Sequence, residues 1–572
     1  MTTTMSGARM GAANLARRLV ARALARDLTV FVAPGLDVAR AYGLDPTAAG
    51  LRIVPTPRHA AVLLLVGEIP PGLRAATAVA YAQMARPRTI IALRTDGAPP
   101  LPAPNVAVTL DQAALVAGVE ELQRIVASAA WSSDAPIFDT PDLQPKEDDG
   151  GGMDHSAMDR GDNKGAMDMS GMDHGAMDMG GMNHGAMDHG DMSSDTDNGG
   201  EGKGDGDEDR GGMDMDMGGG GMSMVMMTKD LPRSPDGLPM EWVEAPVGPI
   251  FPGLPGGLAL SFTLDGDVVA AATVSSGAVG RGLDATWAGP ATSLPERLAL
   301  LDPFARVSYR LLAARAVENA VGATVEETTA DARVGALERE RAVSHLGWLA
   351  LFAGLLGDRW LENRAAALQR DLLRASHIAE VERLRGEVGI FARRVRRTPY
   401  LHRRLVGIGT PRAADKDQST GGAHFTAGSL PRGPVARAAG WPEDARADDP
   451  AYRRLGFAPV VRDDNDAWAR LDVRLAELEQ SLDLVLVVGA VVMPERPRLT
   501  DRDGSGTATV ETPRGAATLS LTVEGGMVRE VILDTPSMHN RTLIEKVAEG
   551  RELADALTGV ASLDLSPWEM DR

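Results

Sequence analysis

Near its N-terminus the chain alternates between continuous apolar runs and amphipathic helical segments. The apolar or β-branched runs, each short enough to be a strand, lie at residues 28–34, 52–57, 60–67 and 88–95. Helical patterns occupy residues 73–85 and 111–130. Continuous apolar strands separated by helices are typical of a parallel sheet that is covered on both faces. We therefore predict an α/β domain with a parallel sheet over residues 1–135.

The last part of the chain, residues 240–572, has a different pattern. Two alternating apolar and polar runs meet at Asp265-Gly266, a pair that favours the type I′ turn of a β-hairpin. From residue 294 to about residue 406, apolar residues recur every three or four positions, as in helices that pack into a bundle. Strand-like runs return near the C-terminus. These features predict an α+β domain with a hairpin at its start, a helical core and C-terminal strands.

Between these two parts, residues 136–239 are predicted to be a disordered linker. Its centre, from Gly150 to Met227, is a loose repeat of Met, Asp, His, Gly and Ala that holds 17 of the 26 methionines. Such a segment buries too little apolar surface to offset the entropy of ordering the chain. Thioether sulfur and imidazole nitrogen suit soft ions, above all Cu(I), and the interleaved carboxylates add affinity for Cu(II).

Eleven side chains of the linker are candidate copper ligands: Met153, His155, Met158, Met172, His174, Met177, Met182, His184, Met187, His189 and Met192. The repeat MDHGAM offers two sulfurs and one nitrogen within six residues, so a flexible chain could close around an ion without a preformed pocket. The alternative is an acidic low-complexity linker with no role in metal binding.

The composition of the chain excludes several kinds of site and of structure in the folded parts. The chain has 572 residues, enough for two or three domains, and a formal net charge of −20, much of which lies in the central segment. We expect no basic face for nucleic acid. The absence of cysteine excludes disulfides, zinc–thiolate sites and cysteine-ligated iron–sulfur clusters. No apolar run reaches the roughly 18 to 20 residues that a membrane-spanning helix needs.

Short motifs flank two strands of the α/β part. Pro57-Arg58-His59-Ala60 precedes one apolar run, and Arg86-Pro87-Arg88 forms the turn before the next. Residues 56–100 thereby resemble the small, cluster-carrying (B) subunit of respiratory complex I and of the membrane-bound group 4 NiFe hydrogenases. The resemblance implies an iron–sulfur cluster, but its cysteine after the last strand aligns with Asp96. A lone carboxylate cannot replace thiolates around such a cluster, so we expect the cluster to be absent.

Several motifs of residues 240–572 follow one another in a recognisable order. They are a Gly/Pro-rich loop at residues 246–257, an E-x-E-R-x-x-S-H-L helix at residues 338–346, a loop at residues 433–440 and a helix from Asp466. Together with the C-terminal tail, they resemble the large (D) subunit of NADH-quinone oxidoreductase and its counterpart in the same hydrogenases. The resemblance implies quinone binding through a loop histidine, and the family's two loop histidines align with Phe251 and Pro255. Neither of these side chains can donate a hydrogen bond.

In the related hydrogenases, cysteines of the large chain are the ligands of nickel and iron. The resemblance places those cysteines at Asp302, Ala305, Ser566 and Glu569. Hydroxyl and carboxylate groups cannot rebuild a four-thiolate nickel–iron site. We therefore expect no cofactor and no catalytic residue in the folded parts.

Charged residues within the helices allow two further interpretations. The spacing of Arg470, Arg474 and Glu477 places them on one helix face, which is usually a solvated or partner-facing surface. His345 is interpreted as a core histidine with satisfied hydrogen bonds and not as a ligand.

The first functional hypothesis is a fusion of small and large subunits in a complex I-like or hydrogenase-4-like membrane assembly. Such a chain would be a redox-inactive structural or coupling module for ion translocation. It would lie on the cytoplasmic face of the membrane through antiporter-like partner subunits. A copper-binding or copper-buffering protein and an active quinone oxidoreductase are the alternatives. The resemblance also implies NAD and quinone binding, but the chain lacks a glycine-rich dinucleotide fingerprint.

Overall fold

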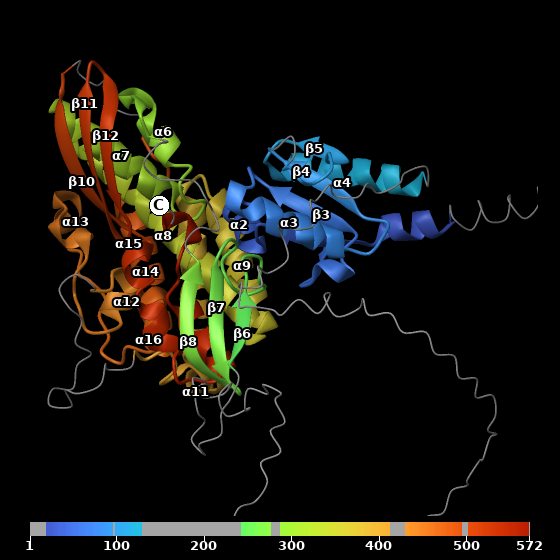
Figure 1. Cartoon of the computed structure of the whole chain (residues 1–572). Helices are drawn as coiled ribbons and strands as arrows, with labels where there is room; N and C mark the ends of the chain where they lie inside the picture. The colour runs from blue at the N-terminus through green and yellow to red at the C-terminus, as the bar shows by residue number, and fades with distance from the viewer. Residues whose placement is uncertain are drawn as a thin grey trace, which may run out of the picture. The chain divides into compact units, whose positions relative to one another are not determined.

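Figure 1 shows the chain in a computed structural model, which describes residues 19–94, 98–128, 242–275, 287–411, 430–494 and 502–570. The described residues before 129 and after 241 belong to one compact unit. None of the helices in these ranges is both long enough and apolar enough to cross a membrane.

The N-terminal part is built on a five-stranded parallel sheet in the order β2-β1-β3-β4-β5. Its strands are β1 (Leu28–Ala33), β2 (Leu51–Ile53), β3 (Val62–Val66), β4 (Thr89–Leu93) and β5 (Val106–Val108). Its helical elements are α2 (Leu36–Ala41), η1 (Pro57–His59), α3 (Pro71–Gln83) and α4 (Gln112–Ala127). Alternate residues of β3 belong to two separate apolar clusters, one on each face of the sheet. The predicted α/β fold is confirmed, although β5 was not among the predicted strands.

Long helices form the core of the C-terminal part. They are α7 (Arg306–Val321), α8 (Glu327–Leu356), α9 (Arg359–Arg374), α10 (Ile378–Arg396) and α14 (Ala467–Val488). The central helix α8 packs against α7, α9 and α14 and buries side chains on all its faces. Glycines with positive φ end α8 (Gly357, +75°) and α14 (Gly489, +72°), because they adopt the left-handed conformation at low cost. The predicted helical core is confirmed.

Shorter helices surround this bundle. They are η4 (Ala291–Ser293), α6 (Leu294–Leu298), α11 (Pro399–Leu405), α12 (Gly433–Arg437), η5 (Ala445–Asp448), α13 (Pro450–Arg454), α15 (Pro536–Asn540), α16 (Leu543–Ala548), α17 (Leu553–Ser562) and η6 (Pro567–Glu569). Of the helices close to the C-terminus, α16 packs against α17 and β8, and α15 packs against η6 and β11.

Two antiparallel sheets complete the C-terminal part. The first has the order β6-β7-β8, with β6 (Val243–Val247), β7 (Ala259–Asp265) and β8 (Val268–Ser275). The second has the order β10-β11-β12-β9, with β9 (Gly289–Pro290), β10 (Gly504–Thr512), β11 (Gly515–Glu524) and β12 (Met527–Asp534). Both the initial hairpin and the C-terminal strands were predicted.

The turn of the first hairpin differs from the prediction. Asp265 pairs with Val268, so the two loop residues are Gly266 and Asp267. Only Gly266 has a positive φ, at 62°, whereas a type I′ turn needs a positive φ at both loop positions. Glycine at the first loop position is the preference of the type II′ turn, and the register follows this preference.

Candidate functional site

The four positions aligned with hydrogenase cysteines converge in one buried region. Ala305 immediately precedes α7, Asp302 lies just before it, and Ser566 and Glu569 belong to the C-terminal tail around η6. All four side chains are 0% exposed. The hydroxyl of Tyr309, on the first turn of α7, donates a hydrogen bond to Oε1 of Glu569 at 2.9 Å. The tail and the start of α7 therefore meet at this point.

Arg514 links these two segments through its guanidinium group. It follows β10 in the turn to β11, and its Nη1 donates to Oδ2 of Asp302 at 3.1 Å. Its Nε donates to the main-chain oxygen of Asp564 at 3.0 Å, and its Nη2 lies 3.3 Å from the Oδ1 atom of Asp564. Burial lowers the pKa of Arg514, but the carboxylates of Asp564 and Asp302 outweigh burial and raise this pKa above its usual value. The positive charge is thus retained inside the protein.

Glu569 accepts hydrogen bonds from neutral groups, and it also lies in the field of the positive charge of Arg514. Both the hydroxyl and the main-chain N–H of Ser537 donate to its Oε2. Burial, helped by the charge of Asp302 and opposed by Arg514, raises the pKa of Glu569 to about 7. Burial and the neighbouring Glu569 also raise the pKa of Tyr309. Near neutral pH, the carboxyl group of Glu569 therefore exchanges between its protonated and ionised forms.

These residues do not fit a nickel–iron centre. Ala305 has no donor atom, and the carboxylate of Asp302 is already engaged by Arg514 and by the main-chain N–H of Phe304 at 2.8 Å. A guanidinium at this point repels a metal cation, and oxygen donors lack the softness of thiolates. The site is a buried salt-bridge and hydrogen-bond cluster made of protein groups.

Sequence reasoning missed the residues that organise this cluster. Neither the patterns of the sequence nor the family resemblance singles out Tyr309, Arg514 or Ser537 as site residues. The available signal was an arginine between Pro513 and Gly515, in a turn bounded by strands with buried residues. An arginine in a turn is usually solvated, so the pattern alone did not point to burial.

The loop of residues 249–257 lies against the first strand-to-helix turn of the parallel sheet. The main-chain N–H of Gly256 donates to Oδ2 of Asp37 at 3.0 Å, and Asp37 is buried. A Cβ atom on Gly256 would lie 2.6 Å from the main-chain oxygen of Pro34, so only glycine permits this approach. Burial raises the pKa of Asp37, and the hydrogen bond from Gly256 opposes this effect.

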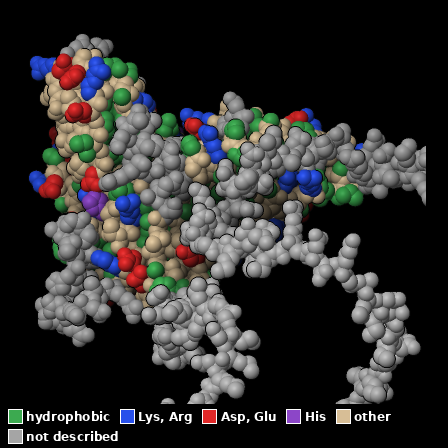
Figure 2. Space-filling model, in the orientation of Figure 1, with side chains coloured by type: hydrophobic (Ala, Val, Ile, Leu, Met, Phe, Trp, Pro, Cys, Tyr) green, Lys and Arg blue, Asp and Glu red, His purple; other side chains and the backbone are tan. Residues whose placement is uncertain are grey.

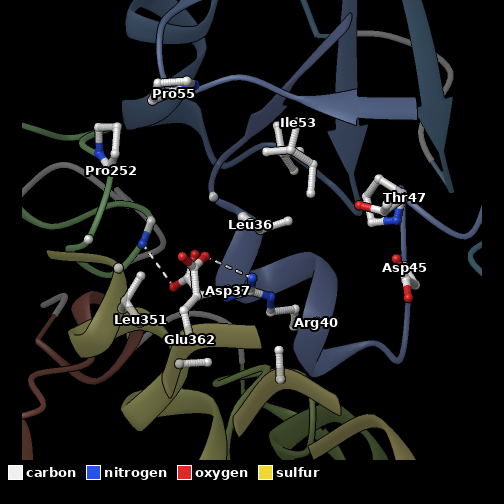
Figure 3. Close-up of a pocket in the computed structure, with 18 of the residues that line it drawn as sticks. Leu36, Asp37, Arg40, Asp45, Thr47, Ile53, Pro55, Pro252, Leu351 and Glu362 are labelled. Carbon is white, nitrogen blue, oxygen red and sulfur yellow. Dashed lines mark hydrogen bonds and ion pairs between the residues drawn. The ribbon is translucent and has the colours of Figure 1, made fainter. Parts of the chain in front are cut away.

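A cavity of about 940 Å³ lies beside this contact (Figure 3). Phe251 lines it, whereas Pro255 is buried within the loop and is not among its lining residues. Charged pairs cross it from the α/β part to α9: Arg40 with Glu362 at 3.2 Å, and Asp45 with Arg370. The structure thus separates the two positions at which the family resemblance places histidines.

A second buried polar cluster joins α8, α12, η5 with its N-cap residue, α13, α14 and β10. Its members are Glu338, Arg341, His345, Arg437, Asp444, Arg446, Tyr452, Glu477, Ser481 and Glu511. Arg437 donates from Nε to Oε1 of Glu477 at 2.8 Å and from Nη1 to Oε1 of Glu511 at 2.8 Å. Burial raises the pKa of Glu477, but Arg437 and the other partners lower it well below its usual range. The cluster ties these elements together through internal charge pairs and hydrogen bonds.

The interpretation of Arg470, Arg474 and Glu477 as a solvated or partner-facing surface was wrong. Their exposed fractions are 0%, 2% and 0%. Arg470 donates from Nη1 to the hydroxyl of Ser562 at 2.8 Å, and the guanidinium of Arg474 lies 4.3 Å from the ring centre of Trp348. Helix-spaced charges usually face water, but here neighbouring elements supply opposite charges and acceptors inside the core.

His345 is a core residue, as interpreted, but only one of its ring nitrogens has a partner. Its Nε2 lies 3.0 Å from Oε2 of Glu477, and its Nδ1 has no hydrogen-bond partner among the described residues. Burial lowers the pKa of His345, although Glu477 opposes this effect.

Two sets of predicted residues lie outside the described residues. The first is the single residue Asp96, and the second consists of the eleven candidate copper ligands of the linker. Their predicted roles stay predictions.

The C-terminal part has the fold of a known class of respiratory protein. A solved chain from the "Structure of the membrane-bound sulfane sulfur reductase (MBS), an archaeal respiratory membrane complex" aligns with a TM-score of 0.51 and 24% identity. The alignment covers 58% of this chain and 99% of that chain. At this identity the comparison shows a shared fold.

Sequence comparisons indicate which subunits of respiratory complexes this chain is similar to. The profile of the family described as "Respiratory-chain NADH dehydrogenase, 49 Kd subunit" matches residues 395–505. The D subunit of NADH-quinone oxidoreductase from Desulfotalea psychrophila is 28% identical over 380 residues, covering 58% of this chain and 98% of the relative. The alpha subunit of the membrane-bound hydrogenase from Pyrococcus furiosus is 27% identical over 368 residues, covering 56% and 86%. The chain therefore contains a domain similar to the 49 kDa subunit of complex I.

Proposed function

We propose that this chain is a peripheral subunit of a complex I-like membrane assembly and that its large-subunit-like part is a redox-inactive structural or coupling module. The similarity to the D subunit of NADH-quinone oxidoreductase and to the alpha subunit of a membrane-bound hydrogenase supports the class of assembly. The α/β part would correspond to the small subunit, joined to the large one by residues 136–239.

The main observation in support of redox inactivity is that Arg514 forms ion pairs with two buried carboxylates. We call this arrangement the ion bridge of Arg514. This guanidinium engages Asp302 at 3.1 Å and Asp564 at 3.3 Å, beside the positions that the family resemblance assigns to nickel ligands. The negative charges of these two carboxylates are thereby neutralised within the protein. A metal centre at these positions would require the ion pairs of Arg514 to break. Breaking them would leave buried charges without partners, at a cost of about 3–5 kcal/mol.

Quinone reduction is not part of this proposal. The family resemblance assigns the hydrogen-bond or proton donor at the quinone headgroup to a loop histidine. Neither Phe251 nor Pro255 can donate, and Pro255 is not among the residues that line the cavity. NAD binding is likewise left out, because the chain has no glycine-rich dinucleotide fingerprint.

A coupling role is supported by the contacts between the two folded parts. The hydrogen bond from Gly256 to Asp37 and the ion pair of Arg40 with Glu362 connect the small-subunit-like sheet to the large-subunit-like loop and helix. We propose that a movement imposed by membrane subunits passes between the parts through this contact. Antiporter-like subunits on the cytoplasmic face of the membrane are the proposed partners.

Purification of the tagged full chain from detergent-solubilised membranes of its host would test the proposal. We expect antiporter-like membrane subunits to copurify, and we expect them to be missing when the tag alone is expressed. Recovery of the chain only as a soluble monomer would contradict the proposed assembly. Iron or nickel in stoichiometric amounts, together with a redox-active EPR signal from the purified chain, would contradict redox inactivity.

A further inference from the structure

The C-terminal half of α10 and the helix α11 carry a dense group of basic side chains. Between residues 393 and 404 the chain has six arginines, one histidine and no acidic residue. Five of these arginines are exposed, and we call them the arginine face: Arg393, Arg394, Arg397, Arg403 and Arg404.

Helical spacing places an apolar side chain beside these arginines on each helix. Ile390 precedes Arg393 and Arg394 by three and four positions, so these residues share one side of α10, and Arg397 follows as the C-cap residue of this helix. Tyr400 stands in the same relation to Arg403 and Arg404 on α11.

The apolar anchors of both helices point the other way. On α10 these are Phe391 and Val395, and on α11 they are Leu401 and Leu405, all of them buried. Both helices therefore turn their basic sides outward.

The arginine face lacks acidic partners within the described part of the chain. Arg396, which faces inward, pairs with Asp472 and Glu479, each at 2.7 Å. No corresponding ion pair joins the five outward arginines to any described acid. On the face shown in Figure 2, acidic and basic side chains lie interspersed. The net charge of −20 conceals this local group of arginines, because it averages over the whole sequence.

Exposed apolar side chains surround these arginines. Ile390 is 64% exposed, Tyr400 57%, Val406 46% and Trp360 39%. Trp360, at the start of α9, belongs to the same surface because the guanidinium of Arg394 lies 3.9 Å from its ring centre. Basic residues near a helix C-terminus are favoured by the helix dipole, but the dipole does not account for exposed Ile, Tyr and Trp among them.

From this geometry we propose that the arginine face and its apolar neighbours form a docking surface for the anionic surface of a lipid bilayer. Arginine binds lipid phosphates through paired N–H donors. Tyr and Trp rings favour the headgroup layer, and aliphatic side chains gain by leaving water for the acyl boundary. The inference goes beyond the proposed function, because it requires lipid and no partner protein.

Vesicle cosedimentation of the purified full chain tests this surface. We expect binding to vesicles of phosphatidylcholine with phosphatidylglycerol, and little binding to phosphatidylcholine alone. The triple variant Arg397→Gln/Arg403→Gln/Arg404→Gln should bind on the order of 100-fold more weakly, since each basic residue near an anionic membrane contributes about a factor of five. Rising salt should weaken binding of the wild type, because it screens surface charges.

Matched variants separate this surface from general charge effects. The control Arg52→Gln/Arg124→Gln/Arg529→Gln removes three arginines with exposed fractions of 60%, 73% and 59%, and it should bind like the wild type.

For the apolar contribution, Tyr400→Ser should weaken binding, whereas Ile532→Ser, at a side chain that is 72% exposed, should not. Equal binding by the two triple variants, or by anionic and neutral vesicles, would overturn the proposal. Preferential binding of polyglutamate or duplex DNA, with no binding to anionic vesicles, would also overturn it.

Discussion

Arg514 provides the most direct test of how the region aligned with the hydrogenase metal site is stabilised. The variant Arg514→Met keeps much of the apolar volume and removes the charge that faces Asp302 and Asp564. These two acids are 0% and 4% exposed, so water cannot replace the lost partner without a rearrangement. Removing one partner of a buried ion pair costs about 3–5 kcal/mol, and we expect a loss of unfolding free energy in this range.

Urea unfolding at neutral pH, followed by tryptophan fluorescence and linear extrapolation, measures this loss. The control Arg529→Met removes an arginine that is 59% exposed and lies 3.9 Å from Glu524, and it should change stability by less than about 0.5 kcal/mol. Adding Asp302→Asn to Arg514→Met should restore part of the loss, because the amide carries no unpaired charge. A loss below about 1 kcal/mol, or no recovery in the double variant, would refute the bridging role.

Three further predictions follow from other parts of the chain. Because the pKa of Glu569 rises from 4.5 to about 7 on folding, the folded chain holds a proton that the unfolded chain has released. Stability should therefore fall as pH rises through this window, and unfolding curves of Glu569→Gln should show a smaller fall; an unchanged pH dependence would argue against the assignment. Gly256→Ala places a Cβ 2.6 Å from the oxygen of Pro34 and should speed hydrogen exchange along this contact, whereas Gly386→Ala, with nothing within 4 Å, should not. Copper binding by the linker predicts that the wild type binds micromolar Cu(I) and that a deletion of residues 150–227 does not; equal binding would refute it.

Much of the fold could be predicted because it depends on local patterns. The continuous apolar runs around β1, β3 and β4 indicated strands buried on both faces, and the three-to-four-residue periodicity indicated the helices of the bundle. The hairpin was identified from Asp265-Gly266, but its turn type was not, because the register depends on pairing across both strands. β5 was not predicted, whereas β2, which also has three residues, overlaps the predicted run at residues 52–57.

The candidate site could be predicted only in part. The family resemblance selected Asp302, Ala305, Ser566 and Glu569, and the structure brings them together in one buried region. The group that neutralises them could not be selected, because Arg514 and Asp302 are 212 positions apart and no local pattern connects them. The interpretation of Arg470 and Arg474 failed for the same reason, since their partners come from other elements.

By itself, the sequence determined which segments form strands and helices, and it excluded thiolate chemistry through the absence of cysteine. Hydrophobic periodicity is a property of neighbouring residues, so it can be read without the fold. Tertiary structure alone decided which charges are buried in pairs, as with Arg514, and which face outward with no acidic partner in the described ranges, as with Arg403. A guanidinium group is stable in the core if carboxylates and hydrogen-bond acceptors surround it, and it is stable at the surface if water does. Which of these environments it meets is decided only when distant segments of the chain pack together.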